Sequence, residues 1–146
     1  MGLAERVQGA VLRLHQRLYE ATDGRIGHNT IGVPTLLMGS TGRRSGRPRR
    51  NALVYAKDGS NYVVVASNGG SDQPPGWLFN VQAKPEVEIQ VARSKSPGTA
   101  RVVQRGDEDY ERLWQLVNAN NKGRYDAYQT QTSRPIPMVV LSADGS

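Results

Sequence analysis

Residues 51–67 read NALVYAKDGSNYVVVAS and contain two extended patterns around a tight turn. β-Branched and aromatic residues recur in Asn51–Lys57 and in Asn61–Ser67, which favours β-strands. Asp58-Gly59 lies between the two runs and is typical of a hairpin turn, because glycine tolerates the positive φ that such turns require. This stretch therefore predicts a pair of antiparallel strands.

Further short strands are expected on both sides of this hairpin. Val87–Val91 alternates apolar and polar residues, as a half-buried strand does. The other expected strands are Thr35–Met38, Thr99–Val103 after Pro97-Gly98, and Pro137–Leu141. Short strands with tight connections predict a small antiparallel barrel of about six strands.

Helices are expected before and between these strands, which makes the fold class α+β. The apolar spacing of Tyr110, Leu113, Trp114 and Val117 predicts a helix over residues 107–117, with Asp107 as its N-cap. Short peripheral helices are expected over residues 77–83 and 124–130.

Residues 1–22 form an expected N-terminal amphipathic helix. Its apolar stripe consists of Leu3, Val7, Val11, Leu14 and Leu18. The stripe can pack on the protein's own sheet, or it can lie on an anionic membrane surface with its arginines beside it. No apolar run reaches the ~20 residues that span a bilayer. We expect a cytoplasmic protein, with the inner face of the membrane as the alternative location of this helix.

Length and composition bound the function. The chain has 146 residues, which predicts a single domain over residues 1–146. It has no cysteine, and His15 and His28 lack the spacing of metal ligands, so no metal site is expected. No hydrolase or P-loop motif is present. The reactive chemistry of an enzyme with this inventory would belong to a bound cofactor.

The segment Thr41–Arg50, TGRRSGRPRR, holds five of the nineteen basic residues, and no acidic residue occurs from Gly24 through Lys57. Arginine grips phosphate or carboxylate through two hydrogen bonds, and glycine lets backbone N–H groups face the same anion. A solvated loop and a nucleic-acid interface are alternatives. Only Tyr55 and Tyr62 lie near enough to stack on bases, so a phosphorylated cofactor tail explains the mixture better.

Three smaller elements are candidate parts of a pocket. Ala66–Gly70 ends a strand with two glycines, Trp77 and Asn80 share one helix face, and Tyr125 and Tyr128 share another. Each element alone also fits an ordinary role, as a turn, a core residue or a packing pair.

Together these elements resemble the deazaflavin-dependent nitroreductases, which use reduced coenzyme F-420. The matching residues run nearly the whole length of the chain. They are Gly32–Leu37, Thr41–Arg49, Leu53–Tyr55, Asp58-Gly59, Tyr62–Ser67, Gly69-Gly70, Trp77, Asn80, Pro85, Val87, Tyr125, Tyr128 and Arg134–Val140.

The resemblance implies a split β-barrel similar to that of FMN-binding oxidases. It also implies coenzyme F-420, which has a hydroxy-deazaflavin ring and a tail of phosphate and glutamates. The tail would bind the residues Arg43, Arg44, Ser45, Arg49 and Arg50. The rest of the cofactor would meet the residues Asn51, Ala52, Leu53, Val54, Val65, Ala66, Ser67, Asn68, Gly76, Trp77, Leu78, Phe79, Asn80 and Tyr125.

The implied reaction is hydride transfer from the reduced deazaflavin to a quinone, an enone or a nitro compound. Tyr125, Ser67 or water would supply the proton, and Tyr125, Tyr128 and Lys122 would meet the substrate. Lys122 replaces a tyrosine of the nitroimidazole-reducing member, which argues against activity on bicyclic nitroimidazoles. Asn68, Ala52 and Pro74-Pro75 also depart from the family pattern.

Other classes stay open from the residues alone. The chain can be an FMN- or haem-binding split barrel, a non-catalytic deazaflavin carrier or a basic nucleic-acid-binding module. Under the leading interpretation the partner is a small-molecule electron acceptor, no nucleic acid is expected, and the protein is a monomer or weak dimer.

Overall fold

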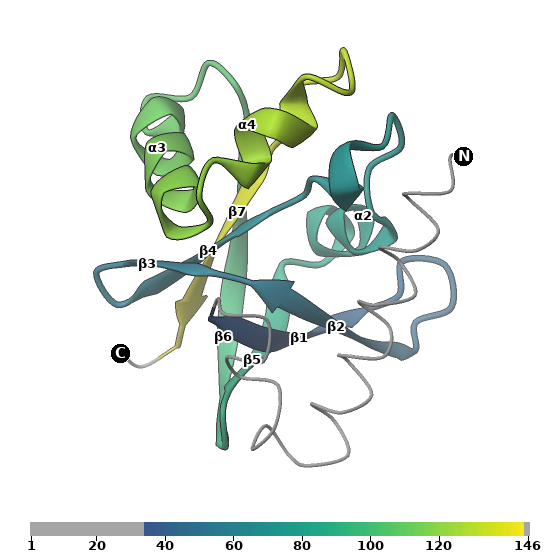
Figure 1. Cartoon of the computed structure of the whole chain (residues 1–146). Coiled ribbons are helices and arrows are strands. Elements are labelled where there is room, and N and C mark those ends of the chain that lie inside the picture. The colour runs from purple at the N-terminus through teal and green to yellow at the C-terminus, as the bar shows by residue number, and fades with distance from the viewer. Residues whose placement is uncertain (1–33, 145–146) are drawn as a thin grey trace.

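The computed structural model describes residues 34–144, so the helix expected over residues 1–22 lies outside the described part. Antiparallel strands dominate this part, with helices between them (Figure 1). In chain order the elements are β1 (Thr35–Thr41), β2 (Pro48–Val54), β3 (Ala56–Asp58), β4 (Asn61–Val65), the 3-10 helix η1 (Asn68–Gly70), α2 (Gly76–Ala83), β5 (Glu86–Val91), β6 (Ser94–Val103), α3 (Tyr110–Asn120), α4 (Arg124–Gln129) and β7 (Met138–Ala143).

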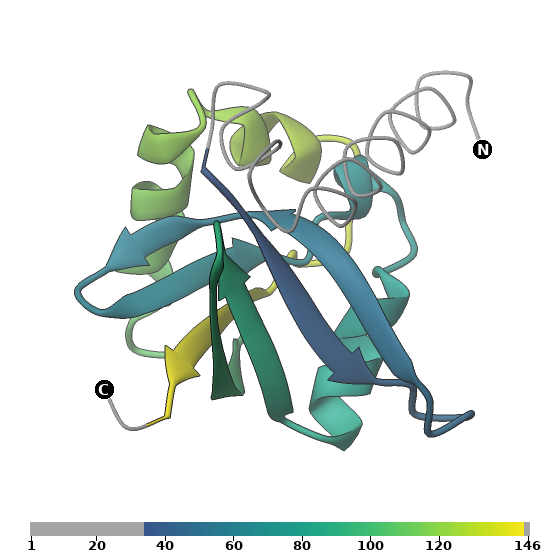
Figure 2. The same cartoon turned by 90° about the horizontal axis from the view of Figure 1, so that it is seen from below.

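One residue forces the sheet to curl. The strand order is β2-β1-β5-β6-β7-β4-β3, so β2 and β3 are the two ends of the sheet. In the chain, however, only Tyr55 separates β2 from β3. Because one residue spans less than about 4 Å, the two ends must meet. Figure 2 shows the resulting curved sheet, which confirms the expected split β-barrel class.

The described residues contain seven strands, one more than expected, because Tyr55 breaks the run 51–57 into β2 and β3. The Tyr55 N–H donates to the carbonyl of Pro34 at 3.0 Å, and its own carbonyl accepts from Asn120 Nδ2 at 2.9 Å. These partners lie outside the strand ladders. The hairpin at Asp58-Gly59 is confirmed, with Gly59 at φ 62°.

The start expected for the strand at Thr99–Val103, which is β6, is wrong. β6 begins at Ser94, and Pro97 and Gly98 lie inside it rather than before it. The reason is that the hairpin turn falls at Ala92-Arg93, where Ala92 adopts φ 52° and Val91 pairs with Ser94. Alanine rarely takes that conformation, so the pattern pointed to the Pro-Gly pair instead.

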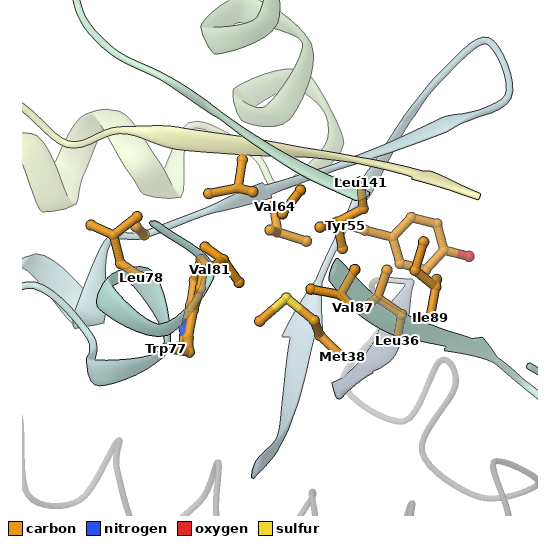
Figure 3. Packing of buried hydrophobic residues seen from close by; sticks show 13 residues of the cluster. Leu36, Met38, Tyr55, Val64, Trp77, Leu78, Val81, Val87, Ile89 and Leu141 are labelled. Carbon is orange, nitrogen blue, oxygen red and sulfur yellow. The ribbon is translucent and has the colours of Figure 1, made fainter. Parts of the chain in front are cut away.

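Two apolar clusters lie on opposite faces of β4 and β7. Val64 faces the barrel interior, while Val63 and Val65 face α3 and α4. Both faces of these strands are therefore buried, which explains why their sequences are continuous apolar runs. Figure 3 shows the interior cluster, in which α2 contributes Trp77, Leu78 and Val81 against Met38 and its neighbours.

α3 begins later than expected. Its first residue is Tyr110, and the Asp107 carboxylate accepts a hydrogen bond from the Gln104 N–H at 2.7 Å instead of capping the helix. Asp107 thus closes the turn before the helix. The expected apolar face is confirmed, because Tyr110, Leu113 and Val117 are buried. No helix within residues 34–144 is long and apolar enough to cross a membrane.

Gly98 gives a test of the packing between β5, β6 and β7. A Cβ at this position would lie 2.5 Å from Ile89 Cδ1 and 2.7 Å from the Ser142 carbonyl oxygen. The carbonyl belongs to the backbone of β7 and cannot move aside. We expect Gly98→Ala to lower the free energy of unfolding by about 1–3 kcal/mol, as overpacking does. Urea denaturation measures this.

Gly76→Ala is the matched control, because a Cβ at Gly76 meets nothing within 4 Å. An equal midpoint shift in the two variants would contradict the crowding described at Gly98.

Candidate functional site

The basic loop between β1 and β2 is a tight turn with its own hydrogen bonds. The Gly42 N–H donates to the Arg47 carbonyl and the Gly46 N–H to the Gly42 carbonyl, both at 2.8 Å. Ser45 Oγ accepts from the Arg47 N–H at 3.1 Å. Ser45 therefore holds the shape of the loop.

Arg43 ties this loop to α2. Its backbone N–H donates to Asn80 Oδ1 at 3.1 Å, and its guanidinium lies 4.5 Å from the centroid of the Phe79 ring. A cation over an aromatic face stabilises an exposed contact by ~0.5–1 kcal/mol. The contacts of Arg43 with Phe79 and Asn80 thus place the basic loop beside the middle of α2.

The segment after β4 is a corner built from left-handed residues. Asn68, Gly69 and Gly70 have φ of 46°, 66° and 85°. A Cβ on Gly70 would lie 3.0 Å from the Tyr128 carbonyl oxygen, so only glycine lets α4 approach this closely. The Asn68 side-chain amide donates to the Gln73 carbonyl at 2.9 Å and closes the following loop.

Arg134 stabilises the same corner through hydrogen bonds to its backbone carbonyls. Its Nε donates to the Ser71 carbonyl at 2.9 Å, and its Nη2 donates to the Ser67 and Ala66 carbonyls at 2.9 and 3.3 Å. Partial burial lowers the pKa of this guanidinium below its ordinary value, and Asp72 opposes that effect. One cation therefore binds three carbonyls around Ser67.

α4 forms the opposite wall of the site. The Trp114 indole Nε1 donates to Asp126 Oδ1 at 2.7 Å, and the Asp126 N–H donates to Asn118 Oδ1 at 2.9 Å. These bonds fix α4 against α3. Tyr125 is buried and packs edge-on against Tyr128 at 6.2 Å between ring centroids.

β2, the corner, the start of α2 and α4 enclose a cavity of about 680 Å³, within the usual range for small-molecule sites. We call it the ring cavity. Its lining consists of Arg49, Arg50, Asn51, Ala52, Leu53, Val54, Val65, Ser67, Asn68, Gly69, Pro74, Pro75, Gly76, Trp77, Asn80, Asn121, Arg124, Tyr125 and Tyr128.

Most of the residues that we expected to bind the cofactor line this cavity, and the remaining ones do not. Ala66 and Leu78 are buried in the barrel interior. Arg43, Arg44, Ser45, Phe79 and Lys122 are exposed and lie outside the lining.

The residues expected to bind the cofactor or the substrate did not include Gly69, Pro74, Pro75, Asn121 and Arg124, which also line the cavity. A sequence signal existed for Arg124, because it lies four residues before Tyr128 on the expected helix over residues 124–130 and so shares its face. Asn121 precedes α4, which begins at Arg124 after the left-handed residues Lys122 and Gly123.

Comparison with known proteins identifies the family. The model of the family described as F-420H(2)-dependent quinone reductase matches residues 11–143. An F-420H(2)-dependent quinone reductase of Mycobacterium tuberculosis is 50% identical over 141 residues, which are 96% of this chain and 95% of that protein.

Solved structures of two other proteins are similar to this chain. The F-420-H2 dependent reductase FDR-A is 35% identical, with a TM-score of 0.67 over 75% of this chain and 94% of that one. A protein solved as a domain-swapped dimer is 30% identical, with a TM-score of 0.69 over 97% of this chain and 100% of that one.

The chain belongs to the F-420H(2)-dependent quinone reductase family. This membership confirms the expected oxidoreductase class and the expected cofactor, coenzyme F-420. It decides against FMN and haem as the cofactor.

The ring cavity suits the cofactor of an F-420H(2)-dependent quinone reductase. Val54, Val65 and the Trp77 edge give apolar walls for a planar ring, and Arg49 and Arg50 line the same cavity at the start of β2. A flat apolar ring with an anionic tail needs this pairing of surfaces.

The Arg134 contacts predict a large effect from one substitution. Arg134→Ala removes three hydrogen bonds from a charged donor, and we expect the free energy of unfolding to fall by about 2 kcal/mol or more. Arg101→Ala is the control, since it removes only a solvent-exposed ion pair with Asp109, and such pairs contribute little to stability. Equal effects in urea denaturation would contradict the role given to Arg134.

Tyr125 predicts an alkaline titration. Burial raises the pKa of Tyr125 from 10.0 to about 12, and a hydrogen bond with Asn121 opposes this only in part. The folded state therefore favours the protonated phenol, and this stabilisation is complete below pH 10 and lost as the pH rises through about 12. Ultraviolet titration of tyrosinate should lose its highest step in Tyr125→Phe. An unchanged highest step in that variant would show that the phenol titrates normally.

Proposed function

We propose that this protein reduces a quinone with reduced coenzyme F-420 in the ring cavity. The observation that carries the proposal is that one cavity combines three arginines (Arg49, Arg50 and Arg124), apolar walls and the hydroxyl-bearing side chains of Ser67, Tyr125 and Tyr128. When bound, the cofactor supplies the hydride. The protein's own residues bind it, orient it and handle the proton.

β2 carries the residues that we propose to bind the tail and the ring of the cofactor. Arg49 pairs with Ser40 and Arg50 with Gly39 in the antiparallel register, so both arginines are carried by the regular backbone of β2 rather than by the loop before it. Residues Asn51–Val54 continue along the same strand into the apolar part of the cavity. We propose that the anionic tail meets the two arginines and that the ring lies farther along β2.

Orientation of the ring depends on the corner at Ser67. Its backbone is held by Arg134 from behind, and the glycines beside it leave room for a flat ligand to approach the main chain. Trp77 and Asn80 border the cavity from α2. A rigid wall of this kind positions two reactants without a large entropic loss at the moment of transfer.

The proton for the reduced quinone comes, in this proposal, from Tyr125 or Ser67. The Tyr125 phenol is protonated at neutral pH and is a hydrogen-bond donor there, and its raised pKa extends this state to more alkaline pH. Arg124 lines the same wall and brings a positive charge that favours a quinol anion. Tyr128 borders the acceptor, whereas Lys122 lies outside the lining.

We further propose a single-domain protein of the cytoplasm that is monomeric or weakly dimeric. The proposed contact of helix 1–22 with the inner face of the membrane rests on the sequence pattern alone, because those residues lie outside the described part.

The proposal predicts that the protein oxidises reduced coenzyme F-420 when menadione is added, followed by absorbance. Arg49→Ala should weaken cofactor binding about tenfold, since a hydrogen bond to a charged group contributes ~1.5–3 kcal/mol. Arg101→Ala, which lies outside the cavity, should bind normally. No oxidation with any quinone would overturn the proposal. Normal affinity in Arg49→Ala would overturn only the role of the arginine.

A further inference from the structure

The end of α3, where the chain turns into α4 (Figure 1), carries three asparagines, Asn118, Asn120 and Asn121. The side chains of the first two are bound to the backbone of neighbouring segments. Asn118 Oδ1 accepts from the Asp126 N–H at 2.9 Å, and Asn120 Nδ2 donates to the Tyr55 carbonyl at 2.9 Å. Neither of them lines the ring cavity, whereas Asn121 does.

Asn121 is buried beside Tyr125. Only 7% of the surface of Asn121 and 6% of that of Tyr125 are exposed, and both residues line the ring cavity. They lie four residues apart, and the Asn121 carbonyl accepts from the Arg124 N–H at 3.2 Å, at the first turn of α4. A buried carboxamide is costly unless it forms a hydrogen bond, so the Asn121 side chain needs a partner.

The partner of the Asn121 side chain is the phenol oxygen of Tyr125. Burial raises the pKa of Tyr125 to about 12, and the hydrogen bond with Asn121 opposes this increase. A hydrogen bond lowers the pKa of a phenol when it is donated to the oxygen, because it then favours the phenolate. The Asn121 amide is therefore the donor. Tyr128 and Arg124 also act on this pKa, Tyr128 by raising it and Arg124 by lowering it.

The direction of this bond decides where the phenol proton can point. A phenol carries one O–H donor, and its oxygen accepts as well. Because the Asn121 amide donates to the oxygen, the Tyr125 O–H must find its acceptor elsewhere. Within residues 34–144 the Tyr125 O–H has no protein acceptor, and the ring itself packs against Trp114 and Tyr128. The proton is therefore available to a ligand in the ring cavity.

We propose that Asn121 is a positioning residue that turns the Tyr125 hydroxyl toward the reduced quinone. In the proton step the O–H bond of Tyr125 breaks and an O–H bond forms at the anionic quinol oxygen, which leaves Tyr125 as a phenolate. The Asn121 amide remains bound to the phenolate oxygen and stabilises its charge. A proton from solvent then restores the phenol. The inference rests on the proposed function, in which Tyr125 is a proton donor.

The first test is a double-mutant cycle. Asn121→Leu keeps a side chain of similar size that cannot donate. We expect kcat for the reduction of menadione to fall roughly 3- to 10-fold, as for one lost hydrogen bond, with KM for menadione unchanged. In the Tyr125→Phe background the same substitution should not lower kcat further, because the bond is already absent. An equal loss in both backgrounds, or a change in KM alone, would overturn the positioning role.

The matched control is Gln115→Leu. It also replaces a carboxamide of α3 by an apolar side chain, but at an exposed position outside the ring cavity. Both kinetic constants should stay at their wild-type values in this variant. Urea denaturation of each variant checks that the comparison is made between folded proteins.

The second test needs no cofactor. In an ultraviolet titration of the ligand-free protein, Asn121→Leu should move the highest tyrosinate step to higher pH, because a donor that favours the phenolate is gone. Gln115→Leu should leave that step in place. Asn121→Asp offers an acceptor instead of a donor and draws the phenol proton away from the cavity. It should therefore lower kcat at least as much as Asn121→Leu does, and a wild-type kcat in Asn121→Asp would contradict the inference.

The two tests separate failure of the inference from failure of the proposed function. An unmoved tyrosinate step in Asn121→Leu overturns the inference, and the proposed function still stands if the wild-type protein oxidises reduced coenzyme F-420 with menadione. Absence of oxidation by the wild-type protein with every quinone refutes the proposed function, and the role of Asn121 in the proton step is refuted with it.

Discussion

The closure of the sheet at Tyr55 is the constraint on which the site depends. Because β2 and β3 are the two ends of the sheet and only one residue joins them, the strand that carries Arg49 and Arg50 is brought back beside β4. The Ser67 corner follows β4 directly. Basic side chains and the corner therefore face one cavity, although nothing in their local sequences places them together. The bonds of Tyr55 to Pro34 and Asn120 hold this bend.

The charged residues and the partly buried residues of β2 lie in different parts of the strand. Arg49 and Arg50 are exposed at the start of the strand, and Asn51–Val54 become partly buried toward its end. A ligand with an anionic tail and an apolar ring can follow this gradient without burying a charge, which would be costly. Buried polar groups around the cavity are instead bound to the protein, as the three carbonyls on Arg134 show.

Strand patterns in the sequence predicted most of the sheet, since β-branched runs and the Asp58-Gly59 turn act locally. The break at Tyr55 and the turn at Ala92 were not predictable, because both depend on partners distant in the sequence or on a conformation that alanine rarely adopts. The candidate site likewise contains some residues that local motifs predicted and others that they did not. Motif residues on β2, at the corner and on α4 were found, whereas Pro74, Pro75 and Asn121 enter the cavity only through tertiary packing.

The same reasoning explains why so few reactive side chains are needed. The cofactor carries the hydride, so the protein must supply position, a dry wall and a proton at neutral pH. Burial of Tyr125 serves two of these needs at once, because it forms the wall and raises the phenol pKa to about 12. A histidine in that place would titrate near neutral pH and lose its proton within the working range. The buried phenol of Tyr125 keeps one protonation state at neutral pH, so packing keeps it available for the donor role proposed above.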